Sequence, residues 1–363
     1  MSLSKPVPTL SQMPWNVKQD IVNSADNDTK FSLRGCSKDF KTLVDSSRFH
    51  FNHLILNSDI QDNSISLYLM VDDYQMKGHK VKFFAHPLGF MRQTWHLDVQ
   101  LEKKVFIGPR NYTDAALAKF FKTIGNPKVS FTKLDILYDH PNEKYESHKL
   151  FVLNKIQEFL GSLNHKLSVE AFTLSLFDCQ EDILKVLPYF KPGTLELLNL
   201  YSGEELGDRT YGPLDLVCEL EQWKQANELT LVSNFNPPLE QWVHFSECVI
   251  QQNDFTVEYV KQVIEAYSNN PNIRCSEFWF ENPKRSNRTE IRNYLSNFKI
   301  LRPKKLFKVP IANSTDYIEA YVFPTGFSFE RCSKTDDDSD SSEQSNNTDE
   351  EENGNSDAEP QLE

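Results

Sequence analysis

The segment SVEAFTLSLFDCQEDILKVLPYFKPGTLELLNL, residues Ser168–Leu200, is the one that decides the fold. Near its two ends, AFTLSL and TLELLNL are short, mostly apolar runs of the kind that form β-strands. Between them, residues 180–190 carry apolar side chains at helical spacing. A strand, a helix and a second strand in so short a segment predict neighbouring parallel strands that are connected through a helix.

The same L-x-L shape recurs on both sides of this segment. Six short runs carry it: KLDIL at Leu134, AFTLSL at Phe172, TLELLNL at Leu195, NELTLV at Leu229, ECVIQ at Cys248 and SEFWFE at Phe278. The intervals of 38, 23, 34, 19 and 30 residues between them are irregular, but each has the size of one strand and its return segment. The recurrence predicts an α/β solenoid of the leucine-rich-repeat kind, and an ordinary α/β sheet is the alternative.

The return segments are expected to be helical at residues 149–163, 180–190, 213–226 and 256–267. In the third of these, Leu220, Trp223 and Ala226 share one face, which we expect to pack on the sheet. Residues 298–329 contain two further apolar runs, which predict a closing hairpin that caps the last unit.

In residues 48–101 the apolar residues recur with a period of two, as in a β-strand, rather than with the period of 3.6 of a helix. The runs HFNHLILNSD, NSISLYLMVDD, HKVKFFAHP and TWHLDVQL are separated by polar breaks, and they predict four strands of an antiparallel meander.

The chain begins with two amphipathic stretches that have little apolar surface of their own to pack on. In residues 14–24, Trp15, Val17 and Ile21 lie on an apolar stripe behind Pro14, which suits a first helical turn. Residues 28–44 predict a second helix, which Gly35 is expected to weaken or kink. Two short helices cannot bury both faces on each other, so apolar surface is left for a partner or for the main body of the chain.

The net charge of -13 is concentrated at the C-terminal end. Residues 333–363 contain twelve acids and one lysine, a charge of -11, which leaves -2 for the rest of the chain. This tail has almost no apolar residues and is predicted to be disordered. Thr335 and Thr348 precede runs of acids, a pattern that suits an acid-preferring kinase, although a purely solubilising role explains the same composition.

One segment, residues 284–308, has nine positive charges against a single acid, Glu290. A solvated surface, a contact with the acidic tail, and recognition of an acidic partner or RNA are all open readings. The near-neutral body of the chain argues against a general nucleic-acid binder.

The composition and the motifs argue against several classes of protein. No apolar run reaches the length of a membrane span, and residues 1–11 lack a signal-peptide core, which predicts a cytoplasmic or nuclear protein. The six cysteines lie far apart and predict free thiols, and no cluster has metal-ligand spacing. With no Gly-rich phosphate loop and no G-x-S-x-G elbow, we expect no catalytic residue, no metal and no cofactor.

Two stretches resemble known families. The stretch LSQMPWNVKQDIVNSADNDTKFSLRGCSKDFKTLV resembles an F-box, and the matching positions are Leu10, Met13-Pro14, Val17, Ile21-Val22, Leu33, Cys36-Ser37-Lys38, Phe40 and Leu43, without a gap. The stretch from residue 168 to 200, together with LVCELEQWKQANELTLVSN, HFSECVI and IRCSEFWFEN, resembles the FTH domain of the nematode F-box A proteins.

The resemblance implies a non-catalytic substrate-recognition subunit of a Skp–cullin–F-box ubiquitin ligase. The F-box would dock on the Skp-type adaptor, and the FTH domain would hold a protein substrate. The adaptor-facing candidates that it implies are Leu10, Met13, Pro14, Val17, Ile21, Val22, Leu33, Cys36, Ser37 and Phe40. Substrate contacts are expected from exposed strand positions and loops, with Tyr201, Phe235, Trp242 and Trp279 as candidates.

The chain departs from the F-box pattern at three positions. Ala25 and Lys30 stand where the motif has leucines, and Gly35 lies inside a helix. These departures favour a rival hypothesis, an F-box-derived scaffold or RNA-regulatory adaptor without ligase coupling. A third reading has the N-terminal arm simply pack on the meander.

The predicted architecture is α/β, or α+β overall. It comprises a helical F-box at residues 8–46, a small antiparallel meander at 47–110, an irregular leucine-rich-repeat-like FTH solenoid at 111–331 and a disordered acidic tail at 333–363. The sequence identifies neither the substrate nor the oligomeric state.

Overall fold

A computed structural model describes residues 10–59, 61–72, 77–96, 101–108, 111–139, 146–175, 180–201, 214–232, 238–252, 255–280, 285–301, 306–312 and 314–333. The helices are η1 (Leu10–Gln12), α1 (Trp15–Ser24), α2 (Asn27–Cys36), α3 (Lys38–Ser46), α4 (Tyr112–Ile124), α5 (Glu146–Ser162), α6 (Gln180–Leu184), η3 (Leu187–Tyr189), α7 (Asp215–Cys218), α8 (Glu221–Lys224), η4 (Leu239–Gln241), α9 (Val257–Asn269) and α10 (Arg285–Leu295). The strands are β1 (Phe49–Asp59), β2 (Ser64–Asp72), β3 (Lys77–His86), β4 (Gly89–His96), β5 (Leu101–Gly108), β6 (Val129–Asp139), β7 (Val169–Ser175), β8 (Leu197–Tyr201), β9 (Glu228–Val232), β10 (Glu247–Gln252), β11 (Cys275–Phe280), β12 (Lys299–Leu301), β13 (Leu306–Pro310), β14 (Tyr317–Phe323) and β15 (Gly326–Cys332). The acidic tail from residue 334 onward lies outside the described residues.

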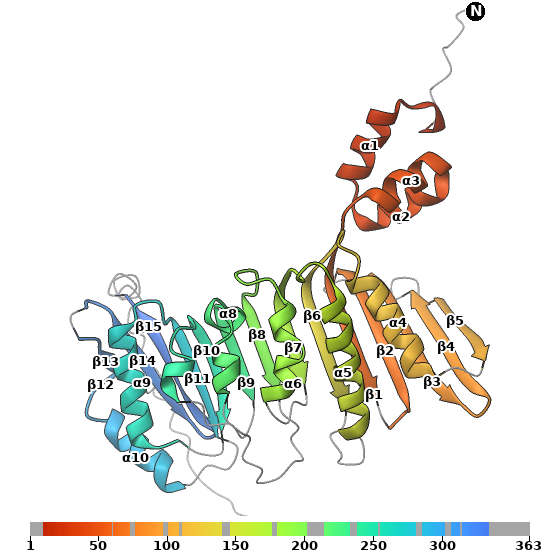
Figure 1. Ribbon diagram of the computed structural model, residues 1–363. Coiled ribbons are helices and arrows are strands. Elements are labelled where there is room, and N and C mark those ends of the chain that lie inside the picture. Colours follow the sequence, from red (N-terminus) through yellow and green to blue (C-terminus); the bar gives the residue numbers. More distant parts are fainter. Residues whose placement is uncertain are drawn as a thin grey trace, which may run out of the picture.

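In the described part of the chain, all strands join one sheet in the order β12-β13-β14-β15-β11-β10-β9-β8-β7-β6-β1-β2-β3-β4-β5 (Figure 1). From β6 to β11 the strands are parallel and follow one another in chain order. The meander β1–β5 joins this block through a parallel pairing of β1 with β6, and β15 closes the other side antiparallel to β11. Residues 47–110 and 111–331 therefore contribute strands to the same sheet.

All six predicted L-x-L strands are confirmed as β6 to β11. The predicted closing hairpin is present as β14 and β15, and β12 and β13 extend it. The α-helices in the connecting segments range from the seventeen-residue α5 to the four-residue α7 and α8. Because these connections differ so much in length and structure, they do not define a repeat, and the solenoid stays an interpretation.

Several element boundaries predicted from the sequence were wrong. The predicted helix at 28–44 is two helices, α2 and α3, and the break lies at Ser37 rather than at Gly35. Ser37 has an extended backbone, and its Oγ accepts a hydrogen bond from the Phe40 N–H at 3.2 Å, which starts a new helix. The meander has a fifth strand, β5, and helices α4 and α10 were not predicted.

The two faces of the sheet differ in what covers them. In β8 the side chains of Leu198 and Leu200 are fully buried, whereas Leu197, Asn199 and Tyr201 alternate with them and are half-buried. Figure 1 shows α4 to α10 along one face, which is where the buried leucines pack. We call the opposite side the helix-free face; within the described residues no helix of this region lies on it.

The predicted structural role of the third helical segment is confirmed. The Trp223 side chain is 1% exposed, and its Nε1–H donates to the Gln241 carbonyl at 2.8 Å. Its ring meets Phe245 edge-to-face at 5.2 Å between centroids. The charged residues Glu219, Glu221 and Lys224 of the same segment are exposed. This tryptophan therefore anchors the short α8 to the core.

Helices α1–α3 form a small unit that projects from the sheet in Figure 1. Its own core consists of the buried side chains Val22, Leu33, Phe40, Leu43 and Val44. The connection to the sheet runs through Phe49, which packs against both this core and the core of the sheet. The unit is therefore a separate packing entity that is tied to the start of β1.

Candidate interaction surfaces

The first candidate surface is the outer side of η1 and α1. Leu10 is 43% exposed, Trp15 is 51% exposed and Val17 is 38% exposed, although all three are large and apolar. Met13 and Ile21 are half-buried beside them, and Pro14 is exposed at the start of α1. Three exposed large apolar side chains on so small a unit indicate an interaction site.

The remaining adaptor candidates do not lie on this surface. Val22, Leu33 and Phe40 are at most 8% exposed and make up the core of the three-helix unit. Ser37 is the N-cap of α3, and Cys36 is exposed with its Sγ–H directed at the Ser32 carbonyl, 3.4 Å away. The structure therefore leaves Leu10, Met13, Pro14, Val17 and Ile21 at least partly exposed between residues 10 and 21, and it assigns the buried three to internal packing.

Lys30, one of the departures from the F-box pattern, points inward. Its side chain is buried, and its Nζ donates to the Arg48 carbonyl at 2.9 Å and lies 5.7 Å from the centre of the Phe49 ring. This lysine fastens α2 to the segment that enters β1. Its charge is therefore not presented to a partner on the α1 surface.

The other two departures are also accommodated. Ala25 packs against the core of the unit. Gly35 lies in α2 with a helical backbone, and a Cβ atom at this position would meet nothing within 4 Å. The glycine therefore costs helix stability without relieving any close contact.

An ion pair holds α1 against α3. The buried Lys18 donates through Nζ to Asp39 Oδ2 at 2.7 Å, and the Asp39 side chain is 54% exposed. The contact fixes the rotation of α1 about its axis, so that Val17 and Ile21 keep to one side of the unit.

The second candidate surface is on the helix-free face. Tyr201 and Trp279 belong to one row of this face, because Tyr201 pairs with Val232, Val232 with Gln251, and Gln251 with Trp279. Trp279 is 36% exposed, and Tyr201 is half-buried. Burial raises the pKa of the Tyr201 phenol, and the negative charge of Asp135 adds to this effect.

The other two substrate candidates are not on this face. Trp242 is 1% exposed, and its Nε1–H donates to Tyr259 Oη at 3.1 Å, so it is a core residue and was wrongly expected to be exposed. Phe235 lies outside the described residues.

An aromatic cluster that the sequence did not reveal surrounds Trp279. The Trp279 and Phe323 rings are 4.9 Å apart between centroids, and the 41% exposed Tyr321 lies 5.9 Å from Phe323. Gly326 pairs with both Trp279 and Phe323, and a Cβ at this glycine would clash with the Phe323 ring. The register of β14 and β15, which brings these rings together, is not visible in the L-x-L pattern.

A polar centre lies further along the helix-free face. His53 Nε2 is 2.7 Å from Asp135 Oδ2, and Lys133 Nζ is 3.6 Å from the same oxygen. Asp135 Oδ1 is buried without a hydrogen-bond partner. The sequence shows no cluster with metal-ligand spacing, and it does not reveal that Asp135 in β6 lies beside His53 in β1.

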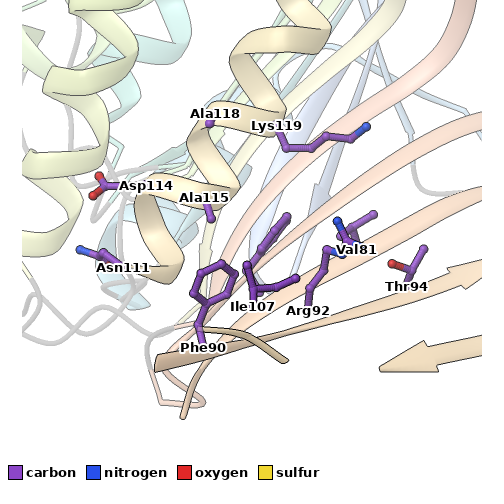
Figure 2. Close-up of a pocket in the computed structure, with 11 residues that line it drawn as sticks. Val81, Phe90, Arg92, Thr94, Ile107, Asn111, Asp114, Ala115, Ala118 and Lys119 are labelled. Atoms are coloured by element: carbon purple, nitrogen blue, oxygen red, sulfur yellow. The ribbon is translucent and has the colours of Figure 1, made fainter. Parts of the chain in front are cut away.

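A pocket of about 720 Å³ lies between α4 and the outer strands of the meander (Figure 2). Its apolar wall consists of Val81, Phe83, Phe90, Ile107, Ala115 and Ala118. Arg92, Thr94 and Lys119 add polar groups, and Asn111 and Asp114 lie at the start of α4. Neither α4 nor its pocket was predicted, although DAALAKFFKTI behind Asn111 has helical spacing and a cap that would have revealed the helix.

The described residues contain no group of three or more His, Cys, Asp or Glu side chains that could hold a metal ion. In the same residues, no helix is both long enough and apolar enough to cross a membrane.

A family model for the FTH domain matches residues 151–300, which is less than half of the chain and lies within the predicted range 111–331. The chain therefore contains an FTH domain that runs from α5 to β12. FTH is a family associated with F-box proteins, and this association supports a role in protein interaction. No curated protein and no solved structure matches the chain.

Proposed function

We propose that this chain is a non-catalytic substrate-recognition subunit of a Skp–cullin–F-box ubiquitin ligase. The α1–α3 unit would bind the Skp-type adaptor, and the FTH-containing sheet would bind a protein substrate. Such a subunit accelerates ubiquitin transfer by raising the local concentration of substrate, and it needs no catalytic residue, metal or cofactor of its own. The role belongs to the cytoplasm or the nucleus.

The observation that supports this proposal most strongly is the exposure of Leu10, Trp15 and Val17 on a unit whose described side chains include only five buried apolar residues. Units shorter than about 40 residues rarely fold on their own core alone and are usually completed by a further interaction. Burying these side chains against a partner would supply that interaction at about 25 cal/mol per Å² of apolar surface. The FTH match supports the same role through its association with F-box proteins.

For the substrate, the proposal favours the aromatic cluster of Trp279, Tyr321 and Phe323, with Tyr201 in the same row as Trp279. Partly exposed aromatic side chains supply large contact areas at a small entropic cost, and they are enriched at the energetic centres of interfaces. Protein binding at this face is therefore proposed to depend on Trp279 more than on the half-buried Tyr201.

The test is the affinity of the purified full chain for a Skp-type adaptor. Leu10→Asp with Val17→Asp would place two carboxylates in the apolar contact, and we expect affinity to fall about 100-fold or more. Asn16→Asp with Asn23→Asp is the matched control, since it adds the same charge at exposed polar positions of the same helix. Equal loss in both variants, or no binding by the folded parent chain, would replace this proposal with the scaffold hypothesis.

A further inference from the structure

The layer of helices on the sheet stops before the sheet does. Toward the β5 edge, α4 is the last helix of the layer, and it packs mainly on β2 and β3 (Figure 1). The α4 side of β4 and β5 therefore carries Phe90, Arg92 and Thr94 from β4 and Ile107 from β5 beside a pocket. Ile107 is 39% exposed, which is unusual for an apolar side chain on the covered side of a sheet.

The shape of this groove suits a helix. Ala115 and Ala118 are three residues apart on α4, and both line the groove in Figure 2. Small side chains at this spacing leave room for another helix to lie close to α4. From Asn111 to Lys119 the wall is about 12 Å long, which corresponds to about two turns of a docked helix. The floor, with Val81, Phe90 and Ile107, is apolar.

The positive charges at one end of the groove favour an acidic ligand. Arg92 and Lys119 both line the groove, and the side chain of neither makes a hydrogen bond or an ion pair in the part of the chain that the structure describes. The pKa of Lys119 is lowered, first by partial burial and then by the positive charges of Lys122 and Arg92. Two cations that repel each other in a partly apolar groove would be stabilised by carboxylates from a ligand.

We propose that the groove between α4 and strands β3–β5 binds an acidic amphipathic helix of a partner protein, whose apolar stripe packs on the floor and whose carboxylates pair with Arg92 and Lys119. The site is separate from the α1 surface and from the aromatic cluster. The chain's own acidic tail has the right charge, but residues 334–363 contain only one leucine and one alanine and so lack an apolar stripe. The groove is also open along exposed Arg92, Ala118 and Lys119, which suits a polypeptide better than an enclosed small molecule.

The experiment uses the full chain and two fluorescein-labelled peptides of about 18 residues, long enough to exceed the groove. Both have a leucine and alanine stripe; one carries glutamates on its flanks and the other carries lysines. Fluorescence anisotropy should show the glutamate peptide binding about tenfold or more tightly than the lysine peptide. Ala118→Trp, which fills the groove without changing its charge, should weaken the glutamate peptide by about tenfold.

Charge reversal makes the test independent of folding defects. In Arg92→Glu with Lys119→Glu the preference should invert, so that the lysine peptide binds more tightly, a gain that an unfolded variant cannot produce. Lys38→Glu with Lys191→Glu makes the same change in net charge at exposed positions and should leave the preference intact. The proposal is overturned by equal binding of both peptides, by a preference that survives the reversal, or by binding of decanoate without binding of either peptide. A failed adaptor assay would not affect this result, because the α1 surface is not involved.

Discussion

The α1–α3 unit and the sheet bury their apolar side chains in different ways. Among its described side chains the unit has five buried apolar residues, Val22, Leu33, Phe40, Leu43 and Val44, and it leaves Leu10, Trp15 and Val17 largely exposed. The sheet has a continuous core that extends from Phe51 in β1 to Phe329 in β15. The difference shows that most of the buried apolar surface belongs to the sheet, and under the proposed function a partner would cover the exposed side chains of the unit.

The largest expected effects on stability come from truncating one buried phenylalanine in each of the two cores. Phe40 and Phe172 are both fully buried, and truncation to alanine costs about 3–5 kcal/mol in either place. Phe40→Ala should unfold the three-helix unit alone, whereas Phe172→Ala, which loses an edge-to-face contact with Phe190, should lower the stability of the whole sheet. Hydrogen exchange resolved by peptide distinguishes these outcomes. If Phe40→Ala loosened β6 to β11 as much as α1–α3, the two regions would not be separate packing entities.

A smaller effect is expected where the closing hairpin is fastened to the core. Tyr267 is buried, and its hydroxyl donates to the Phe329 carbonyl at 3.0 Å and lies 3.1 Å from Ser276 Oγ. Tyr267→Phe removes both contacts, of which Ser276 keeps a second partner in Cys248 Sγ at 3.3 Å, and should cost about 1–3 kcal/mol. Tyr321→Phe is the control, because the Tyr321 side chain is 41% exposed and its change should stay within about 0.5 kcal/mol. Urea unfolding that shifts equally in both variants would contradict this role of Tyr267.

The pH dependence of stability should separate the same two regions. Burial lowers the pKa of His148 and of His244, and a hydrogen bond to the Trp223 carbonyl opposes this shift only in part for His244. Because the folded pKa lies below the unfolded value of 6.5, the unfolded chain takes up protons first as the pH falls. The stability of the sheet should therefore be complete above pH 6.5 and decrease below it.

Residues 15–46 contain no histidine, so the stability of the α1–α3 unit should not change over the pH range in which the two histidines take up protons. Thermal unfolding followed at several pH values, with His148→Gln and His244→Gln as controls that should reduce the dependence, checks this expectation. A sheet whose stability rises as the pH falls through 6.5 would have the opposite sign and would rule the account out.

The smallest effect concerns glycine. Gly35→Ala in α2 meets no steric obstacle and should stabilise the three-helix unit by about 0.5–1 kcal/mol. Gly193→Ala should do the reverse, because Gly193 has a φ of +73° and a Cβ there would lie 3.1 Å from Gln225 Oε1. Hydrogen exchange of the α2 amides and the unfolding midpoint of the sheet report the two changes. Destabilisation by Gly35→Ala would mean that the glycine is needed for the backbone of α2.

The sequence predicted the strands of the sheet better than its helices. The L-x-L runs at Leu134 to Phe278 correspond to six strands because each run has to place its leucines or phenylalanine under the helix layer, and burial leaves a clear pattern. The short α7 and α8 are held by anchors such as Trp223 rather than by helical periodicity, so their boundaries could not be read. The joining of β1 to β6 is a long-range pairing that leaves no local signal.

The candidate surfaces were predicted only in part. Leu10, Val17 and Trp279 were picked out as contact residues and are exposed, but the motif positions Val22, Leu33 and Phe40 are internal. An apolar residue in an amphipathic helix has the same pattern whether it faces a core or a partner, so sequence alone could not separate the two groups. Trp242 was misplaced because its burial comes from packing on Tyr259 and Phe278, which are distant in the sequence. The groove beside α4 requires residues from four elements, β3, β4, β5 and α4, to meet, which only the fold determines.

The most direct test of the central claim is hydrogen exchange of the full chain with and without a Skp-type adaptor. The account predicts slower exchange across residues 10–24 and in α2 and α3 when the adaptor is bound, with little change from β6 to β11. An adaptor that leaves exchange in α1–α3 unchanged, or that protects the sheet instead, would contradict the claim that this unit is completed by that partner.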